Sequence, residues 1–397
     1  MEHLHDTTVL VLGLGESGLA MARWCARFGA RVRVWDSRSG DALPAANVAA
    51  LAEHVPGAQW IHGALTDDAF AEVGLVLKSP GLAPGDPRIA APLQRAAEAG
   101  ALVQGELELF ARALARLDEE RGYAPKVLAI TGTNGKTTTT AMAAALIART
   151  GKRVAAAGNI GPTMLQTLAD ALDLEPAPMA RDLESPEAEP PADVDSGAAS
   201  DNQADTDTDT DSDTQPQPLP DDEPAPILPP PAPAAPRFEF LPEVWVLELS
   251  SFQLDEAKGF EPSAAVVLNL SEDHLDWHGA MPQYVAAKAR VFGRNAVMVV
   301  NRDDPRVEAL VPPPEVVKGA KGRKAVTIER QVVRFGLGAP QRPGDYGLVD
   351  ENGMAWLVRA RELDETLKRG RGGKGAGAAV AEELVIQRLM PADALRV

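Results

Sequence analysis

The chain has 397 residues, 45% of them hydrophobic, which is enough to form more than one buried core. The formal net charge is −18, but residues 172–236 contain 17 acidic side chains and one arginine, so this segment alone contributes −16. The rest of the chain is close to neutral, as in an ordinary globular enzyme, and we predict no nucleic-acid partner.

The single cysteine, Cys25, excludes an intramolecular disulfide and fits a reducing compartment. We expect it to be a small buried residue on a helix. Charged and polar residues precede the short apolar run Val9–Leu12, so no signal peptide is predicted. No stretch reaches the roughly 20 apolar residues of a membrane helix. We therefore predict a cytoplasmic protein without membrane insertion.

The first 117 residues alternate between short apolar runs and longer helix-like segments. The expected order is a strand over 8–12, a helix up to residue 28, strands over 31–35 and 75–77, a helix over 88–99, a strand over 101–103 and a helix over 106–117. Such alternation is typical of an α/β domain with a parallel sheet. We predict a Rossmann-like domain over residues 1–117.

A glycine motif, Gly13-x-Gly15-x-x-Gly18, follows the first strand, and Asp36 ends the second. This arrangement resembles the fingerprint that holds the diphosphate of a dinucleotide at a helix N-terminus. The motif by itself is weak evidence for any one ligand. It is compatible with NAD, with the phosphates of another nucleotide, or with close packing of a strand on a helix.

A second alternation begins at residue 127. Strands are expected over 127–130, 153–156, 244–249, 264–269 and 296–300, with helices over 137–149 and 282–292. Beyond residue 323 the pattern changes to short strands with glycine turns, which we interpret as a small appended β subregion. Residues 118–397 are thus predicted to form a second α/β domain.

Residues 172–236 interrupt this domain with a low-complexity sequence that includes an Asp-Thr repeat from Asp205 to Thr214. Such a composition buries too little apolar surface to offset its ordering entropy, so we predict a disordered acidic linker. Lengthening a loop to about 65 residues adds only about 2 kcal/mol of closure free energy, which a domain tolerates. The alternative interpretation is a docking segment for a partner.

The most specific motif lies between the strand at 127–130 and the helix that follows it. A glycine-rich turn here leads into a helix N-terminus, which directs backbone N–H groups and the helix dipole at a phosphate. In this geometry Lys136 reaches the β- and γ-phosphates of ATP, and the Thr137 hydroxyl binds Mg²⁺. Ile130 replaces the first glycine of the ordinary P-loop, so the motif is a variant. Its residues are Thr131, Gly132, Thr133, Asn134, Gly135, Lys136, Thr137 and Thr138.

Further polar groups follow apolar strands of the same domain. Glu248 stands at the end of an apolar strand. Two interpretations are open: a metal ligand beside the P-loop, or an ordinary exposed acid. His274 lies in a polar segment, where a metal or phosphate role and simple hydrogen bonding both remain open. His274 and His278 lack the additional ligands of a structural zinc site. From the residues alone, Lys288 is a solvated lysine on a helix.

Together these motifs resemble the Mur ligase family over almost the whole chain outside 172–236. The loop at 131–138 has the family's form of the ATP-binding loop, which explains Ile130. Asn159, Glu248 and the Glu-Asp-His-Leu-Asp segment from residue 272 follow in the family's order. Three other segments resemble the D-glutamate-adding branch of the family: Ser79–Gly81, Gly105–Phe110 and Leu249–Leu254.

The resemblance implies a substrate site in the first domain. This domain would bind the uridine nucleotide of UDP-N-acetylmuramoyl-L-alanine, and its glycine loop would hold UDP in place of NAD. Asn159 and Gln253 of the second domain would approach the muramoyl-alanine part of the substrate. The implied substrate-binding residues of the first domain are Ser17, Asp36, Ser37, Arg38 and Ser79.

The resemblance also implies an ATP site with two Mg²⁺ ions. Residues 132–138 would bind ATP, and Thr137 and Glu248 would hold the first Mg²⁺. His274 and a carbamylated Lys288 would hold the second. The implied catalytic residues are therefore Lys136, His274 and Lys288.

The implied reaction is ATP-dependent ligation of D-glutamate to UDP-N-acetylmuramoyl-L-alanine through an acyl phosphate, in peptidoglycan precursor synthesis, by a monomer. The family continues with a third, glutamate-binding domain that we do not find in this sequence, so we expect little or no turnover by residues 1–397. Another Mur or folylpolyglutamate-type ligase, or a non-catalytic nucleotide-binding module, remains the alternative. An NAD oxidoreductase is disfavoured because it leaves residues 131–138 without a role.

Overall fold

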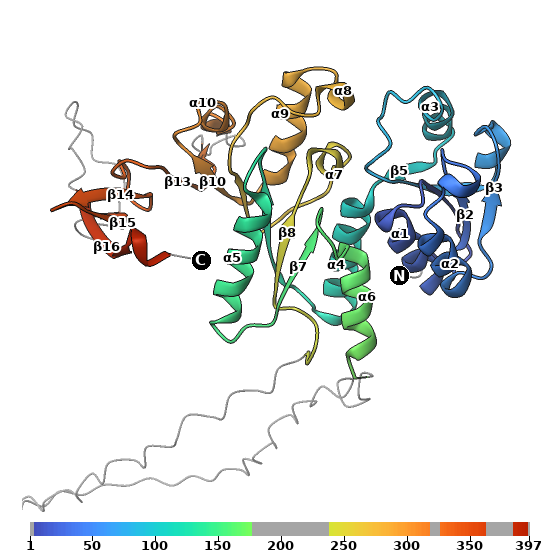
Figure 1. The fold of residues 1–397 in the computed structure, drawn as a ribbon, viewed down its shortest axis with the longest axis horizontal. Helices are drawn as coiled ribbons and strands as arrows, with labels where there is room; N and C mark the ends of the chain where they lie inside the picture. Colours follow the sequence, from blue (N-terminus) through green and yellow to red (C-terminus); the bar gives the residue numbers. More distant parts are fainter. Residues whose placement is uncertain (1–3, 177–237, 318–325, 363–383, 396–397) are drawn as a thin grey trace, which may run out of the picture. The chain divides into compact units, whose positions relative to one another are not determined.

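Two parallel β-sheets with packed helices dominate the structure, which confirms the predicted α/β class (Figure 1). The computed structural model describes residues 4–176, 238–317, 326–362 and 384–395. Among these residues, no helix combines the length and apolar character needed to cross a membrane.

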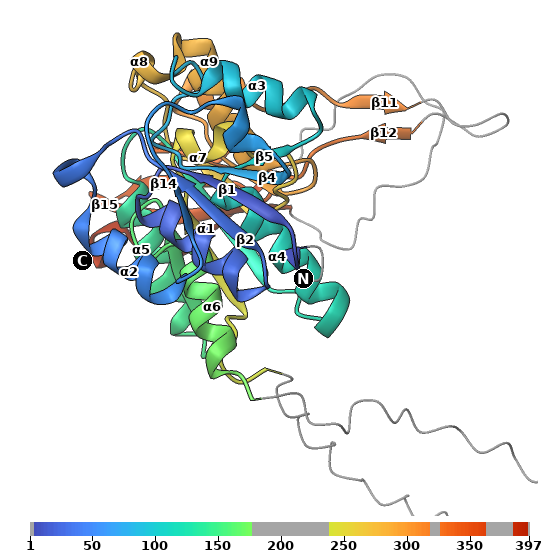
Figure 2. The ribbon, with the colours of Figure 1, turned by 90° about the vertical axis from the view of Figure 1, so that its right-hand side faces the viewer.

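The first sheet has five parallel strands in the order β3-β2-β1-β4-β5, and Figure 2 shows several of them side by side. Its strands and helices are β1 (Thr8–Leu12), α1 (Glu16–Arg27), β2 (Arg31–Trp35), α2 (Ala45–His54), β3 (Gln59–Ile61), β4 (Val73–Lys78), α3 (Ala90–Glu98), β5 (Leu102–Gln104) and α4 (Glu106–Arg121).

The centre of this sheet is its most apolar part. All five residues of β1 are buried, as expected for a central parallel strand covered on both faces. Helix α1 packs on β1, β2 and β4 and buries Met21, Trp24 and Cys25. Each such apolar side chain contributes about 1.5–3 kcal/mol on burial. Cys25 is therefore a buried residue on a helix, as predicted, and burial raises the pKa of its thiol to about 12.

The second sheet has six parallel strands in the order β13-β10-β9-β6-β8-β7. Figure 1 shows α5 on one side of β7 and β8 and helices α4 and α6 on the other. Its elements are β6 (Lys126–Thr131), α5 (Lys136–Ala148), β7 (Val154–Gly158), α6 (Met164–Leu174), β8 (Val244–Glu248), α7 (Ser251–Asp255), β9 (Ala264–Val267), α8 (Leu275–His278), α9 (Met281–Ala289), β10 (Val297–Asn301), α10 (Pro305–Glu308) and β13 (Val332–Phe335).

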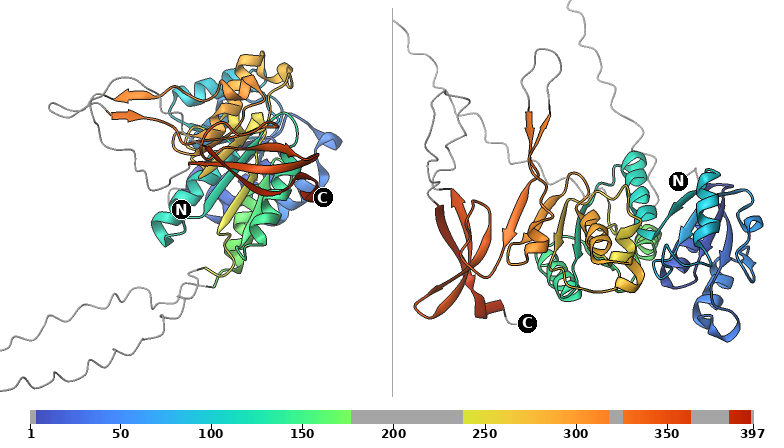
Figure 3. Two further views of the ribbon diagram at one scale, coloured as in Figure 1. Left: turned by 90° about the vertical axis from the view of Figure 1, so that its left-hand side faces the viewer. Right: turned by 90° about the horizontal axis from the view of Figure 1, so that it is seen from above.

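The segment beyond residue 323 was predicted to be one appended β subregion, and its structure differs from this prediction. β13 pairs in parallel with β10 and so completes the large sheet. β14 (Tyr346–Glu351), β15 (Met354–Glu362) and β16 (Leu384–Pro391) form a separate antiparallel sheet, drawn in dark orange to red in Figure 3. A further hairpin joins β11 (Glu315–Val317) to β12 (Val326–Ile328). Pairing between distant strands is not visible in local sequence patterns, which explains the difference.

Two predicted boundaries fall within helices. Residues 172–174 are the last three of α6, so they are helical and not part of a disordered linker. The predicted disorder of residues 177–236 lies outside the described residues. The predicted domain boundary at 117/118 falls within α4, and the described residues of the segments 1–174 and 240–397 form one compact unit. The division into two domains stays a prediction.

Candidate functional site

The order of the strands places two loops where ligands bind in parallel sheets. In the first sheet, β1 lies between β2 and β4, and the chain after β1 forms the glycine loop of residues 13–18. In the second sheet, β6 lies between β8 and β9, and the chain after β6 forms the ATP loop of residues 131–138. Both loops therefore lie at the carboxyl ends of strands, next to a reversal of strand order.

The glycine loop is held by the carboxylate of Asp36 at the end of β2. Its Oδ2 accepts a hydrogen bond of 2.6 Å from the Leu14 N–H, and both of its oxygens accept from the Arg38 guanidinium at 2.8–2.9 Å. Burial alone raises the pKa of Asp36, but the hydrogen bonds from Arg38 and Leu14 outweigh it and lower the pKa. Asp36 is thus a fixed anion that orients Arg38 beside the loop.

Close packing explains the third glycine of the motif. A Cβ atom at Gly18 would lie 1.9 Å from the Gly13 carbonyl oxygen, whereas nothing lies within 4 Å of a Cβ at Gly15. The hydroxyl of Ser79, directly after β4, donates to the same Gly13 oxygen at 2.8 Å. Gly18 lets α1 start against the strand, and Ser79 ties the two neighbouring strand ends together.

The structure brings the five residues predicted for the uridine nucleotide into one cavity of about 460 Å³. This cavity is lined by Ser17, Asp36, Ser37, Arg38 and Ser79, among others. A neighbouring cavity of about 850 Å³ shares Asp36, Ser37 and Arg38 and adds Trp60 and His62, whose rings stack with centroids 6.4 Å apart. This ring pair has no signal in the sequence, because β3 is only three residues long and carries no motif.

The ATP loop ends at Gly135, which precedes α5 with φ of 83°, a left-handed conformation that favours glycine. The Lys136 ammonium group folds over the loop and donates to the carbonyl oxygens of Gly132 and Thr133 at 3.1 and 2.9 Å. Thr137 and Thr138 are exposed in the first turn of α5. The strand, turn and helix therefore have the arrangement of a phosphate-binding loop.

A segment after β9 clamps this loop. Asn269 and Asn134 exchange two hydrogen bonds, with the Asn134 N–H donating to Asn269 Oδ1 at 2.8 Å and Asn269 Nδ2 donating to the Asn134 carbonyl at 3.1 Å. The Thr133 hydroxyl contacts the Tyr284 hydroxyl at 2.9 Å and accepts from the Ser271 N–H at 3.0 Å. Tyr284 and Asn269 were missed in the sequence because only the tertiary fold brings them to the loop.

Lys288 lies beneath the same loop and is only 2% exposed. Its ammonium group donates to the Gly132 carbonyl at 2.8 Å, the oxygen that also accepts from Lys136. Burial, together with the positive charge of Lys136, lowers the pKa of Lys288 to about 7. The interpretation of Lys288 from its residue type alone, as a solvated lysine, is therefore wrong, because α9 turns it into the core.

Glu248 and Asn159 follow neighbouring strand ends beside the ATP loop. Glu248 is 3% exposed and pairs in register with Ile130, the residue before Thr131. Its carboxylate accepts a hydrogen bond of 3.3 Å from the Asn159 amide. The alternative of an exposed strand-end acid is excluded. A buried carboxylate next to a phosphate loop is suited to a divalent cation.

Two predicted residues have other contacts in this structure. The Gln253 side chain completes a capping box with Ser250 at the start of α7, so it stabilises that helix. His274 is about half exposed, lies 3.4 Å from Asp273 and packs on the ring of Phe252. No recorded contact joins His274 to Lys288, and no group of three His, Cys, Asp or Glu side chains suited to a metal occurs among the described residues.

Comparisons with known proteins agree with this geometry. Residues 130–180 and 239–334 match the Mur ligase middle domain, and residues 7–105 match the MurD-like N-terminal domain of Mur ligases. The chain is 47% identical to the UDP-N-acetylmuramoylalanine--D-glutamate ligase of Albidiferax ferrireducens, covering 100% of this chain and 63% of the relative. It is 39% identical to the enzyme of the same name from a Polaromonas strain, covering 100% of this chain and 69% of the relative.

Solved structures are more distant. A pseudomurein peptide ligase from Methanothermus fervidus is 16% identical, with a TM-score of 0.32 and coverage of 89% of this chain and 61% of that protein. MurF ligase from Thermotoga maritima is 12% identical, with a TM-score of 0.35 and coverage of 98% and 57%. The chain spans about 61–69% of the length of the curated relatives it matches. From the matched domains and these relatives, the chain belongs to the Mur ligase family, and within it to the MurD type.

Proposed function

We propose that this chain provides the nucleotide-substrate and ATP-binding sites of a ligase that joins D-glutamate to UDP-N-acetylmuramoyl-L-alanine in peptidoglycan precursor synthesis. The names of the relatives support this reaction. The observation that carries the proposal is the Lys136 ammonium group, which folds over the loop to the Gly132 carbonyl above the buried Lys288. Transfer of a phosphoryl group to a carboxylate brings two anions together, and the Lys136 cation at this loop offsets their repulsion.

In the proposed first step, the alanine carboxylate of the substrate attacks the γ-phosphorus of ATP. The bond to the β-phosphate oxygen breaks, and an acyl phosphate and ADP result. Lys136 and the N–H groups at the start of α5 hold the γ-phosphate during this transfer. The D-glutamate amine then attacks the acyl carbon, loses a proton and expels inorganic phosphate, which leaves an amide.

Mg²⁺ would be held by the Thr137 hydroxyl and the Glu248 carboxylate, and it supplies charge neutralisation for the phosphates. These residues fit the ion, because the buried Glu248 carboxylate accepts a single recorded hydrogen bond among the described residues and retains lone pairs for a cation. The cofactors of the proposal are therefore ATP and Mg²⁺, as in the family.

A second Mg²⁺ and a carbamylated Lys288 are the finer part of the proposal. With a pKa lowered to about 7, a large fraction of Lys288 is a neutral amine at neutral pH, the form that adds CO₂. The product is an anionic carbamate, which replaces a cation by an oxygen ligand. His274 is then the neighbouring ligand by resemblance to the family. We also propose a cytoplasmic location and a monomeric state.

The test is calorimetric titration of the chain with UDP-N-acetylmuramoyl-L-alanine, using UDP-N-acetylglucosamine and NAD as controls. We expect selective binding of the first ligand. Ser79→Ala removes the hydroxyl that ties the glycine loop and should weaken binding about fivefold or more. Binding of NAD in preference to the uridine ligand, or equal binding of all three by a folded sample, contradicts the proposal.

A further inference from the structure

A third cavity lies at the other end of the first sheet from the glycine loop. It has a volume of about 780 Å³ and is lined by the first residues of β1 and β2, the turn after α2, and side chains of α1 and α6. Thr8 and Arg31 line it, whereas the glycine loop follows Leu12. Because a strand rises about 3.3 Å per residue, the length of β1 separates the two sites by roughly 15 Å.

Positive charge is concentrated in this cavity although the whole chain is acidic. Four arginines and a histidine line it, together with the carboxylates of Asp173 and Glu72. Asp173 is paired with Arg27 at 2.6 Å, so these two charges cancel. The basic side chains that line the cavity are Arg23, Arg27, Arg31, Arg33 and His54.

The other arginines have no carboxylate partner among the described contacts. Arg31 donates to the Thr8 hydroxyl at 3.2–3.3 Å, and Arg33 donates to the carbonyl oxygens of Ala69 and Ala71 at 3.3 and 2.7 Å. These neutral acceptors orient the guanidinium groups without cancelling their charge. Arg23 has no recorded hydrogen bond or ion pair in the part of the chain that the structure describes.

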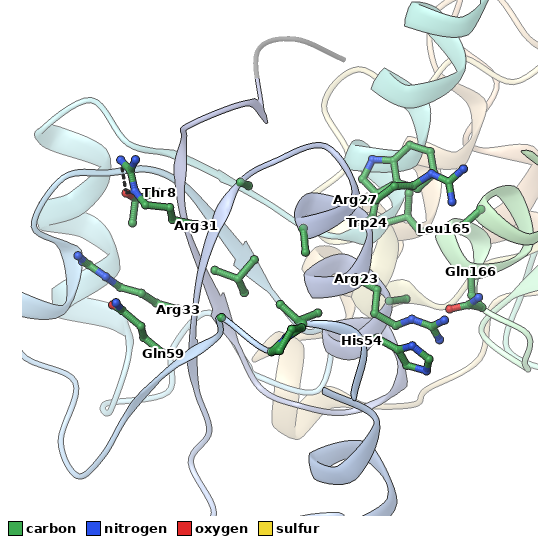
Figure 4. A pocket seen from close by; sticks show the side chains of 18 of the residues that line it. Thr8, Arg23, Trp24, Arg27, Arg31, Arg33, His54, Gln59, Leu165 and Gln166 are labelled. Atoms are coloured by element: carbon green, nitrogen blue, oxygen red, sulfur yellow. Dashed lines mark hydrogen bonds between the residues drawn. The ribbon is translucent and has the colours of Figure 1, made fainter. Parts of the chain in front are cut away.

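The side chains gather at two ends of the cavity (Figure 4). Arg23 from α1, His54 from the end of α2 and Gln166 from α6 lie near one another at one end. Arg33 and Gln59 lie at the other end, on neighbouring strands of the sheet. Guanidinium, imidazole and amide groups all donate hydrogen bonds, so both ends suit an anion.

We propose that this cavity binds a small phosphorylated molecule, with Arg23 and His54 as the principal anion contacts. The Gln166 amide donates one N–H to Asp170 at 2.5 Å, and its second N–H is a further donor to the ligand. The guanidinium fork matches phosphate oxygens in two parallel hydrogen bonds. A volume of about 780 Å³ lies in the range of small-molecule sites. The site is separate from the proposed uridine and ATP sites, and it does not depend on the ligase assignment.

The experiment uses inorganic pyrophosphate as the probe, titrated calorimetrically into the full chain with the glycine and ATP loops saturated by UDP and ADP. We expect one additional binding event. Arg23→Ser combined with His54→Ala should weaken it by about tenfold or more. The control is Arg95→Ser, which removes an exposed arginine that is paired with Asp67 and does not line the cavity, so it should leave binding unchanged.

A second variant distinguishes a loss of binding from a loss of folding. Gln166→Glu changes a partly exposed side chain on α6 and places a negative charge in the cavity, so it should also weaken pyrophosphate binding about tenfold. Circular dichroism melting of each variant verifies the fold. Absence of the extra binding event, or equal binding by the wild type and all variants, overturns the proposal. Equal affinity for tricarballylate, a tricarboxylate, overturns the assignment to phosphate.

Discussion

The glycine loop and the ATP loop are built alike but present different chemistry. Each follows a central parallel strand and leads into a helix N-terminus. Around the glycine loop, neighbouring strand ends contribute the Asp36 carboxylate and the Ser79 hydroxyl. Around the ATP loop, the contributions are two lysines and the Glu248 carboxylate. The two units therefore share one backbone arrangement and differ in the charged side chains that the loop, a helix and the neighbouring strand ends bring to it.

The largest effect is expected from Gly18→Ala in the glycine loop. The new methyl group meets the Gly13 carbonyl oxygen at 1.9 Å, so the strand and helix must separate, at a cost of about 3 kcal/mol. Urea unfolding measures this loss. Gly15→Ala is the matched control, because its Cβ meets nothing within 4 Å and should cost less than about 0.5 kcal/mol. Equal stability of the two variants contradicts the packing role of Gly18.

Lys136→Ala tests the charge of the ATP loop. Loss of the ammonium group should weaken binding of a non-hydrolysable ATP analogue about 100-fold, which corresponds to about 2.7 kcal/mol. Binding of UDP should stay within about twofold, since the proposed contacts of the uridine nucleotide lie beside the glycine loop of the other sheet. Calorimetry with both ligands measures the difference. A parallel loss of both affinities would show that the two loops are not independent.

Lys288 provides a pH test of the buried cation. Its pKa is lowered to about 7 in the folded protein, against 10.5 for the free side chain. Between pH 7 and pH 10.5 the unfolded state binds more protons than the folded state. The free energy of unfolding of the wild type should therefore rise with pH across this range. Below about pH 7 the lysine is charged in both states, so the full cost of burying the charge remains. The neutral variant Lys288→Gln lacks this dependence.

We therefore expect the stability advantage of Lys288→Gln to shrink by about 2 kcal/mol between pH 6.5 and pH 9. Urea unfolding in CO₂-depleted buffer measures it without interference from carbamylation. Curves for wild type and variant that stay parallel across this range would mean that Lys288 is charged throughout, and the lowered pKa would be wrong.

The smallest effect is expected at Tyr284, which supports the ATP loop through Thr133. Tyr284→Phe removes a hydroxyl contact of 2.9 Å and should cost about 1 kcal/mol, with about fivefold weaker ATP-analogue binding. Tyr346→Phe on β14 is the control, since its hydroxyl makes no recorded hydrogen bond among the described residues. Similar ATP-analogue affinities for both variants would argue against a supporting role of Tyr284.

Local sequence patterns were sufficient for the loops and most elements of the sheets. The spacing of Gly13, Gly15 and Gly18 and the run from Thr131 to Thr138 follow from short-range backbone requirements, so they are readable along the chain. The strands at 8–12 and 31–35 are found where apolar runs predict them. By contrast, α2, β3 and α6 were not predicted, because their residues carry weaker local patterns.

The α/β class, the two loops and, through resemblance, the Mur ligase family can therefore be read from the chain alone. The strand order, the joining of β13 to the large sheet and the burial of Lys288 became visible with the folded structure. It also brought Tyr284 and Asn269 to the ATP loop across more than a hundred residues of sequence. These features depend on contacts between distant segments, whose energies arise from packing and burial and leave no local periodicity in the chain.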